Sequence, residues 1–199
     1  MELTHNSHLF SSIRAGRKVD LPSWPNKREL VRESFETLER AGYTIGSGYM
    51  AIRNPAKWRF VYTVEHFWHG TDLFALGETS FGMIRGVHYQ NKDTFEAYTT
   101  ALAQERLPLR RAFRMNPDQR LRREVILLLK TGSLDAGYFR KKYKVELLDV
   151  FEAEFQSLLE NDLAEVDGDT IRLTREGLLQ VDWLLPKFYE PEYLGVRYT

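Results

Sequence analysis

The sequence predicts an α/β half followed by a largely helical half, and three observations lead to this prediction. In the first half, short runs rich in aromatic and β-branched residues alternate with helical patterns, which favours an α/β arrangement. In the second half, longer stretches carry apolar residues three or four positions apart, as amphipathic helices do. Hydrophobic residues make up 43% of the 199, which is enough to form a core. We expect two domains, residues 1–104 and 105–199.

The first half is expected to contain two helices and several short strands. Apolar residues at helical spacing after Asn26, with Gly42 at the expected stop, predict a helix over residues 26–42. Composition and turn signals predict the remaining elements: a strand end at 1–3, strands over 43–52, 60–64 and 72–76, a glycine-containing loop over 77–86, and a helix over 93–105.

The second half is expected to be helical with one hairpin. Asn116 or Asp118 is suited to cap a helix over residues 118–130, which Gly132 would stop. Gly168 follows Asp167 at the tip of a hairpin predicted over residues 166–171. Further helices are expected over 138–143, 147–159 and 174–185. Because three helices, a hairpin and a final helix follow one another, we predict a winged-helix-like domain.

Composition and charge exclude several kinds of function. Lys and Arg total 28 and so do Asp and Glu, and a net charge of zero disfavours a general nucleic-acid-binding protein. The chain has no cysteine, which excludes disulfides, cysteine nucleophiles and cysteine-ligated clusters. No apolar run is long enough to span a bilayer and the first residues do not resemble a signal peptide, so a cytoplasmic protein is expected.

Four stretches of the sequence, in a fixed order, carry a resemblance to a known family. They are DLFALGETSFGMIRGVHYQN at residues 72–91, Tyr98 followed by LPLRR at 107–111, RREVILLLKTG at 122–132 and LTREGLLQVDWLLP at 173–186. In this order and spacing they resemble the C-terminal part of the oxygen-independent coproporphyrinogen III oxidase-like family of radical S-adenosylmethionine (SAM) enzymes.

This resemblance implies a fold and an activity. Members of the family have a partial, TIM-like barrel followed by a helical C-terminal domain. Residues 1–104 would then supply the end of the barrel, its distal strands and helices, and residues 105–199 the winged-helix-like domain. SAM and a [4Fe–4S] cluster are the cofactors of the parent family, and a tetrapyrrole is its substrate. No part of this chain matches the CxxxCxxC loop that holds the cluster.

We therefore expect a catalytically incomplete portion of such an enzyme. It would bind a tetrapyrrole-like small molecule and would work with a cluster-bearing partner chain or as a homodimer. Neither a membrane nor a nucleic acid is expected as its partner. No catalytic residue and no metal ligand is assigned.

The candidate site residues fall in two groups. Ligands of parallel α/β sheets collect at the carboxyl ends of the strands, so the glycine-containing loop and its surroundings are expected to contact SAM. This cofactor-binding group consists of Gly77, Glu78, Ser80, Ile84 and Gln90. Arginine suits carboxylates such as propionates, and histidine suits a tetrapyrrole. The substrate-binding group consists of Arg110, Arg111, His66 and His88.

Two other functions stay open from the sequence. One is a stand-alone haem- or tetrapyrrole-binding protein that uses His66 or His88. The other is a winged-helix DNA-binding protein that uses the basic run at residues 139–144. The structural alternative for this run is a solvated helix face. Some of these residues also suit structural roles. Asn91 is suited to cap a helix, and the two arginines at 110 and 111 are suited to salt bridges between the domains.

Overall fold

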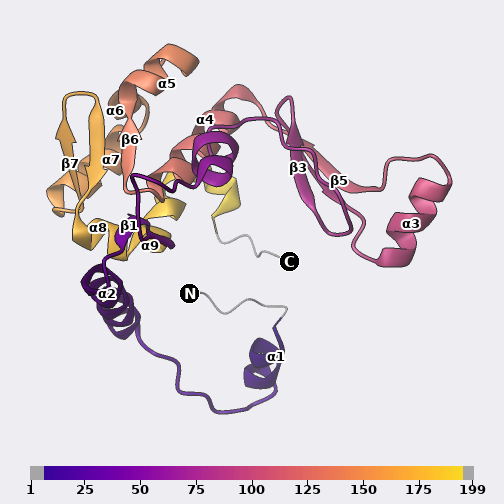
Figure 1. Cartoon of the computed structure of the whole chain (residues 1–199), viewed down its shortest axis with the longest axis horizontal. Coiled ribbons are helices and arrows are strands. Elements are labelled where there is room, and N and C mark those ends of the chain that lie inside the picture. Colours follow the sequence, from indigo (N-terminus) through magenta and orange to yellow (C-terminus); the bar gives the residue numbers. More distant parts are fainter. Residues whose placement is uncertain (1–6, 195–199) are drawn as a thin grey trace.

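The structure is a computed structural model that describes residues 7–194. The C-terminal half forms a helical body, and a sheet with one helix at its far end projects from this body (Figure 1). A short helix, α1 (His8–Arg14), stands away from both parts (Figure 1). The strand end expected at residues 1–3 lies outside the described residues. None of the helices in the described part of the chain has the length and apolar character needed to cross a membrane.

The second helix, α2 (Trp24–Arg40), confirms the helix predicted over residues 26–42. Its first turn is capped by Ser23, whose side chain accepts a hydrogen bond from the backbone N–H of Asn26 at 3.3 Å. The single strand predicted over residues 43–52 is wrong. The chain turns at residues 48–49, so β1 (Thr44–Ser47) and β2 (Met50–Ile52) pair as an antiparallel hairpin.

The strand predicted over residues 60–64 is also wrong, because Val61–Phe67 forms a π-helix, η1. Val64 and Phe67 lie three residues apart and both pack against the hydrophobic core beside the buried Trp68. Helical spacing brings these side chains to one side, so tertiary packing outweighs the strand preference of a run rich in β-branched and aromatic residues.

The projecting sheet consists of β3 (Phe81–Ile84), β4 (Val87–Asn91) and β5 (Leu109–Arg114), in that spatial order. The strand predicted over 72–76 is wrong, since only an isolated bridge between Leu73 and Met83 forms there. The loop predicted over 77–86 is wrong in part, because it contains β3. Strand β5 was not predicted at all.

The helix predicted over residues 93–105 is confirmed as α3 (Phe95–Ala103). Thr94 caps it, and Asn91 does not. Every strand pairing among residues 7–194 is antiparallel, so the parallel sheet expected in the first half is wrong. The partial barrel is therefore not confirmed by the strand order.

The helical body begins with α4 (Pro117–Leu129), which confirms the helix predicted over 118–130. Asn116 and Gln119 form a capping box at its start. The following elements are β6 (Ser133–Asp135), α5 (Ala136–Tyr143), α6 (Leu147–Val150), α7 (Glu152–Glu160), β7 (Ala164–Asp167), β8 (Thr170–Leu173), α8 (Arg175–Leu179), α9 (Val181–Leu184), and the 3₁₀-helices η2 (Leu185–Phe188) and η3 (Pro191–Tyr193).

Strands β6, β8 and β7 form a second three-stranded sheet, with β8 in the middle. The predicted hairpin at residues 166–171 is confirmed by the pairing of β7 with β8. The helix predicted over 138–143 is confirmed by α5. The helix predicted over 147–159 is broken at Phe151, and the one predicted over 174–185 is broken at Gln180, since both residues leave helical backbone angles.

The hydrophobic core lies in the helical body. Phe151, Phe155 and Phe188 are almost fully buried, and their ring centroids lie 5.2–6.3 Å from one another. Trp68, from the first half of the chain, belongs to the same core. Arg32 of α2 also forms an ion pair with Glu176 of α8 at 2.8 Å. Residues before 104 thus pack onto the second half, and the domain boundary at 104 stays a prediction.

Candidate ligand-binding site

One face of the projecting sheet gathers aromatic and polar side chains, and we refer to it as the sheet face. Residues that pair directly across antiparallel strands project to the same side. Phe81 pairs with Gln90, which pairs with Arg111. In the next row on this side, His88 pairs with Phe113. The sheet face thus consists of Phe81, Met83, His88, Gln90, Arg111 and Phe113, with Met83 paired to His88.

The two phenylalanines of the sheet face are unusually accessible. Phe81 and Phe113 are each 48% exposed, while His88 is half-buried between them and the rest of the sheet. The rings of Phe81 and His88 stack with centroids 5.5 Å apart. This surface offers aromatic faces next to a guanidinium, which suits a flat apolar ligand that carries an anionic group.

Gln90 and Arg111 contact each other directly, as the sequence could not show. The Nε of Arg111 donates a hydrogen bond to Oε1 of Gln90 at 2.8 Å, and Nε2 of Gln90 donates to the carbonyl of Thr79 at 3.3 Å. Arg110, one residue earlier, forms an ion pair with Asp93 at 2.9 Å. A β-bulge interrupts the register here, with Arg110 as the extra residue, so the ion pair with Asp93 is what distinguishes Arg110 from Arg111, which pairs with Gln90.

The residues expected around the glycine loop are largely occupied by contacts within the protein. The N–H of Gly77 donates to the hydroxyl of Tyr98 at 3.0 Å, and the N–H of Thr79 donates to the carbonyl of Lys92 at 2.8 Å. The Ser80 hydroxyl donates to the carbonyl of Leu76 at 2.7 Å. The amides of residues 77 and 79 are thus engaged within the protein in this structure, and the contact of the loop with SAM stays a prediction.

The remaining loop residues lie apart from that cluster of bonds. Glu78 is exposed, and Ile84 is partly buried at the end of β3. Asn91 is buried in β4, where its side-chain amide donates to the carbonyls of Ala75 and Gly77 at 3.3 and 2.9 Å. Asn91 thus secures the loop to the sheet, instead of capping a helix.

The two candidate histidines lie in different places. His66 is exposed on η1, whereas His88 lies in β4 on the sheet face. The pKa of His88 lies below its ordinary value, because burial disfavours the charged form and the guanidiniums of Arg123 and Arg111 repel it. No group of three or more His, Asp or Glu side chains arranged to hold a metal ion occurs within residues 7–194.

A buried carboxylate in α4, which the sequence did not single out, organises the body behind the sheet. Glu124 is 3% exposed and accepts hydrogen bonds from the hydroxyls of Tyr138 and Tyr143 at 2.8 and 2.6 Å. Its Oε1 also accepts from Nζ of Lys142 at 2.6 Å. Burial and these bonds to Glu124 raise the pKa of both tyrosines. The spacing of Glu124 within the apolar face of α4, next to Val125 and Leu121, is a sequence signal that could have revealed its burial.

The basic run at residues 139–144 therefore does not form one solvated face. The side chain of Lys142, which is 37% exposed, reaches Glu124 and its Nζ also donates to the carbonyl of His69 at 2.8 Å, whereas Lys141 is an exposed residue outside these contacts. Sequence reasoning also missed Phe81, which fell in the loop predicted over 77–86, and Phe113, because β5 was not recognised. No regular alternation of apolar and charged residues marks Leu109–Arg114, so the sequence held no such signal for that strand.

Comparison with known proteins gives the class of this fold. No family model matches the chain. Coproporphyrinogen III oxidase (HemN) from Escherichia coli, whose structure is described as that of a radical SAM enzyme, superimposes with a TM-score of 0.68 at 22% identity. The match covers 93% of this chain and 46% of HemN. The chain thus has the fold of part of a radical SAM enzyme.

Curated relatives point to the particular family. The oxygen-independent coproporphyrinogen III oxidase of Pseudomonas aeruginosa is 28% identical over 188 residues, which covers 88% of this chain and 38% of the relative. The enzyme of the same name from Escherichia coli K12 is 26% identical over 192 residues, covering 89% and 42%. A Synechocystis enzyme of this name is 33% identical over 108 residues, covering 52% and 22%.

The chain is therefore related to the oxygen-independent coproporphyrinogen III oxidases, and the resemblance noted in the sequence is confirmed. It spans less than half the length of the relatives it matches. The donor set of these 199 residues does not fit the family's iron–sulfur cluster, because thiolates hold such clusters and the chain has no cysteine.

Proposed function

We propose that this chain is the C-terminal portion of a coproporphyrinogen III oxidase-like radical SAM protein, and that it binds a tetrapyrrole without performing radical chemistry by itself. The observation that carries the proposal is the similarity to the named oxidases over 88–89% of the chain, combined with the absence of any cysteine. The radical chemistry needs a cluster, and these residues offer no thiolate to hold one.

The sheet face supports a tetrapyrrole as the ligand. A tetrapyrrole such as a coproporphyrin combines a large apolar surface with carboxylate side chains. Phe81 and Phe113 present exposed rings for apolar contact, and Arg111 presents a guanidinium for a carboxylate. The hydrogen bond from Arg111 to Gln90 restrains the side chain before a ligand arrives, which lowers the entropy lost on binding.

The architecture is proposed in the terms of the family. Residues 1–104 would form the end of the barrel, and residues 105–199, which include α4 to β8, a winged-helix-like domain. From α4 to β8 the elements follow as one helix, one strand, three helices and a hairpin, and β6 pairs with β8. This order supports a winged-helix-like domain. DNA recognition is not part of the proposal, since α7 carries Glu152, Glu154 and Glu160, which would repel phosphates.

A partner is proposed because the projecting sheet and α3 leave large apolar side chains uncovered. Phe74, Leu76, Phe95 and Leu107 are 66–76% exposed. Such a cluster of exposed apolar groups is typical of an interaction surface. We propose that a cluster-bearing chain covers it, and that a homodimer covers it when that chain is absent.

Titration with coproporphyrin III, a fluorescent porphyrin that carries carboxylates, tests tetrapyrrole binding. We expect saturable fluorescence changes with a Kd in the micromolar range, about 1–50 µM. Absence of a saturable change at a protein concentration of about 100 µM would contradict the proposal. Binding of haem alone, with a Soret shift that disappears in the His88→Ala variant, would favour the haem-binding alternative instead.

A further inference from the structure

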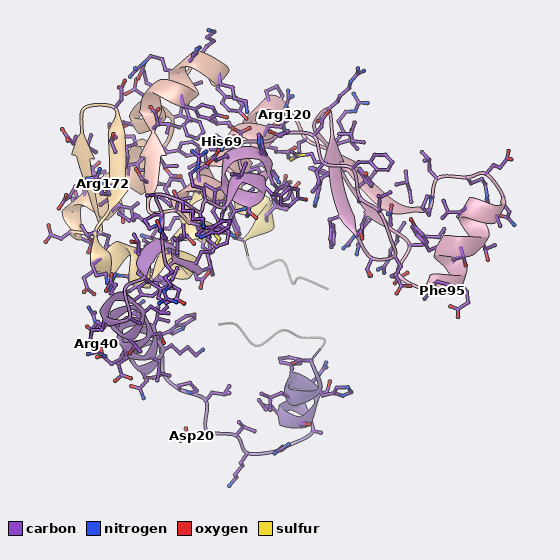
Figure 2. All side chains as sticks on the ribbon, in the orientation of Figure 1. Asp20, Arg40, His69, Phe95, Arg120 and Arg172 are labelled. Carbon is purple, nitrogen blue, oxygen red and sulfur yellow. The ribbon has the colours of Figure 1, made fainter. Side chains whose placement is uncertain are left out.

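A pocket of about 520 Å³ lies between the turn joining β3 and β4 and helices α4 and α5. It is separate from the contacts of Gln90 and Arg111, because the strand register places those residues at the opposite end of the sheet from Arg85. Figure 2 shows Arg120 where the projecting sheet meets the helical body. The volume falls within the range of roughly 300–1,000 Å³ that is usual for small-molecule sites.

The charged side chains that line this pocket are mostly positive. They are Arg85, Arg120, Arg123, Lys142, Asp72 and Glu124. Lys142 and Glu124 neutralise each other at 2.6 Å. What remains is three guanidiniums against the single carboxylate of Asp72, so the pocket has an excess of positive charge.

Arg120 and Arg85 are available to a ligand. In the described part of the chain, neither side chain makes a hydrogen bond or an ion pair, and both are exposed. Asp72 forms no ion pair with the Arg85 guanidinium within residues 7–194; its carboxylate instead accepts a hydrogen bond from the backbone N–H of Arg85 at 2.8 Å. That bond fixes the turn in which Arg85 and Gly86 both have positive φ, and so it positions the arginine at the edge of the pocket.

Arg123 supplies the third positive charge from the pocket's inner side. Its guanidinium lies 4.8 Å from the ring centroid of Phe67 and donates only a long hydrogen bond, 3.4 Å, to the carbonyl of Phe67. Burial lowers the pKa of Arg123 below its ordinary value. No carboxylate other than those of Asp72 and Glu124 lines the pocket beside it. An anion placed here would relieve the repulsion among the three guanidiniums.

We propose that this pocket binds a small polyanion carrying phosphate or carboxylate groups, with Arg85, Arg120 and Arg123 as its ligand-contacting residues. Guanidiniums bind both groups through paired N–H donors. The apolar side chains of Met83, Met115 and Pro117 form the rest of the wall and would accommodate a short organic body.

Isothermal titration of the full chain at low ionic strength, with pyrophosphate and with citrate as probes, tests this proposal. We expect one site per chain with a Kd below about 1 mM for at least one probe, weakened by added salt. The Arg120→Gln variant should weaken binding about tenfold or more, because it removes a charged hydrogen-bond donor. Lys141→Gln is the control, since it removes the same charge from an exposed position of α5 outside the pocket.

Each outcome decides the question. Tighter binding of pyrophosphate identifies a phosphate ligand, and tighter binding of citrate a carboxylate ligand. Undetectable binding of both probes at about 1 mM would overturn the proposal. So would equal losses in the Arg120→Gln and Lys141→Gln variants, which would show attraction to net charge alone. No porphyrin is used, so a negative result leaves the proposed tetrapyrrole binding untouched.

Discussion

The guanidinium of Arg111 is held by Gln90, through a hydrogen bond of 2.8 Å between neighbouring strands β5 and β4. Its sequence neighbour Arg110 forms an ion pair with Asp93. The two adjacent arginines thus have different partners, although the sequence pattern did not distinguish them, and Arg111 is the one that pairs with Gln90 on the sheet face.

The first prediction uses this difference. If Arg111 binds a tetrapyrrole carboxylate, Arg111→Gln should weaken coproporphyrin III binding by about tenfold, a loss of one charged hydrogen bond. Arg110→Gln removes the same charge one residue away and should change the Kd by less than about twofold, since exposed ion pairs contribute little. Fluorescence titration of the three proteins measures this. Equal effects of the two substitutions would show that the sheet face is not the binding surface.

The second prediction concerns pH. Burial, followed by repulsion from Arg123 and Arg111, lowers the pKa of His88 from its ordinary value of 6.5. As the pH falls, the unfolded chain takes up this proton before the folded chain does. His88 therefore reduces the stability of the folded state as the pH drops below 6.5, until the lowered pKa of the folded state is passed.

The His88→Gln variant should remove this part of the pH dependence. Urea denaturation midpoints, measured in steps from neutral to mildly acidic pH, should fall less steeply in the variant than in the original chain. His66→Gln, at an exposed histidine, is the matched control for the loss of one imidazole. An unchanged slope in the His88 variant would mean that His88 titrates alike in both states.

The third prediction concerns the buried carboxylate. Glu124→Gln removes the charge that faces Lys142 and places an amide among the hydroxyls of Tyr138 and Tyr143. We expect the free energy of unfolding to fall by about 2 kcal/mol. This is below the usual cost of breaking a buried pair, since the side chain of Lys142 is 37% exposed. Urea denaturation checks it, with the exposed Glu152→Gln as control, and a loss below about 0.5 kcal/mol would contradict the role of Glu124.

The fourth prediction concerns the uncovered apolar surface. Leu76 and Leu107 are 76% and 74% exposed, so replacing both with lysine should cost little stability. If this surface mediates association, the double variant should shift the chain from dimers or larger species towards the monomer. Size-exclusion chromatography with light scattering measures the mass. Leu30→Lys, at an exposed leucine of α2, is the control, and a monomeric original chain would argue against the surface.

Much of the helical body could be predicted because its signals are local. The capping box of Asn116 and Gln119 and the apolar face of α4 define that helix within one short stretch. The tip at Gly168 likewise defined the hairpin of β7 and β8. The breaks at Phe151 and Gln180 were missed, since the apolar pattern continues across both residues.

The projecting sheet could not be predicted in the same way, because its contacts are distant in sequence. Strand β5 contains three arginines, two of which were interpreted as substrate-binding or salt-bridge residues, and no strand was predicted there. Its pairing with β4 depends on residues about twenty positions away, such as Gln90 and Arg111. The residues of the pocket come from four segments that only the fold brings together, so no motif in the sequence pointed to Arg85 and Arg120 as a pair.

Anaerobic reconstitution with iron and sulfide, followed by addition of SAM and a reductant, tests the central claim most directly. The claim is that this chain contributes a ligand-binding portion without the radical source. We predict no visible absorbance of a [4Fe–4S] cluster on the purified chain and no 5′-deoxyadenosine from SAM, because the sequence contains no thiolate ligand. A chain that acquires such a cluster and cleaves SAM would contradict the account.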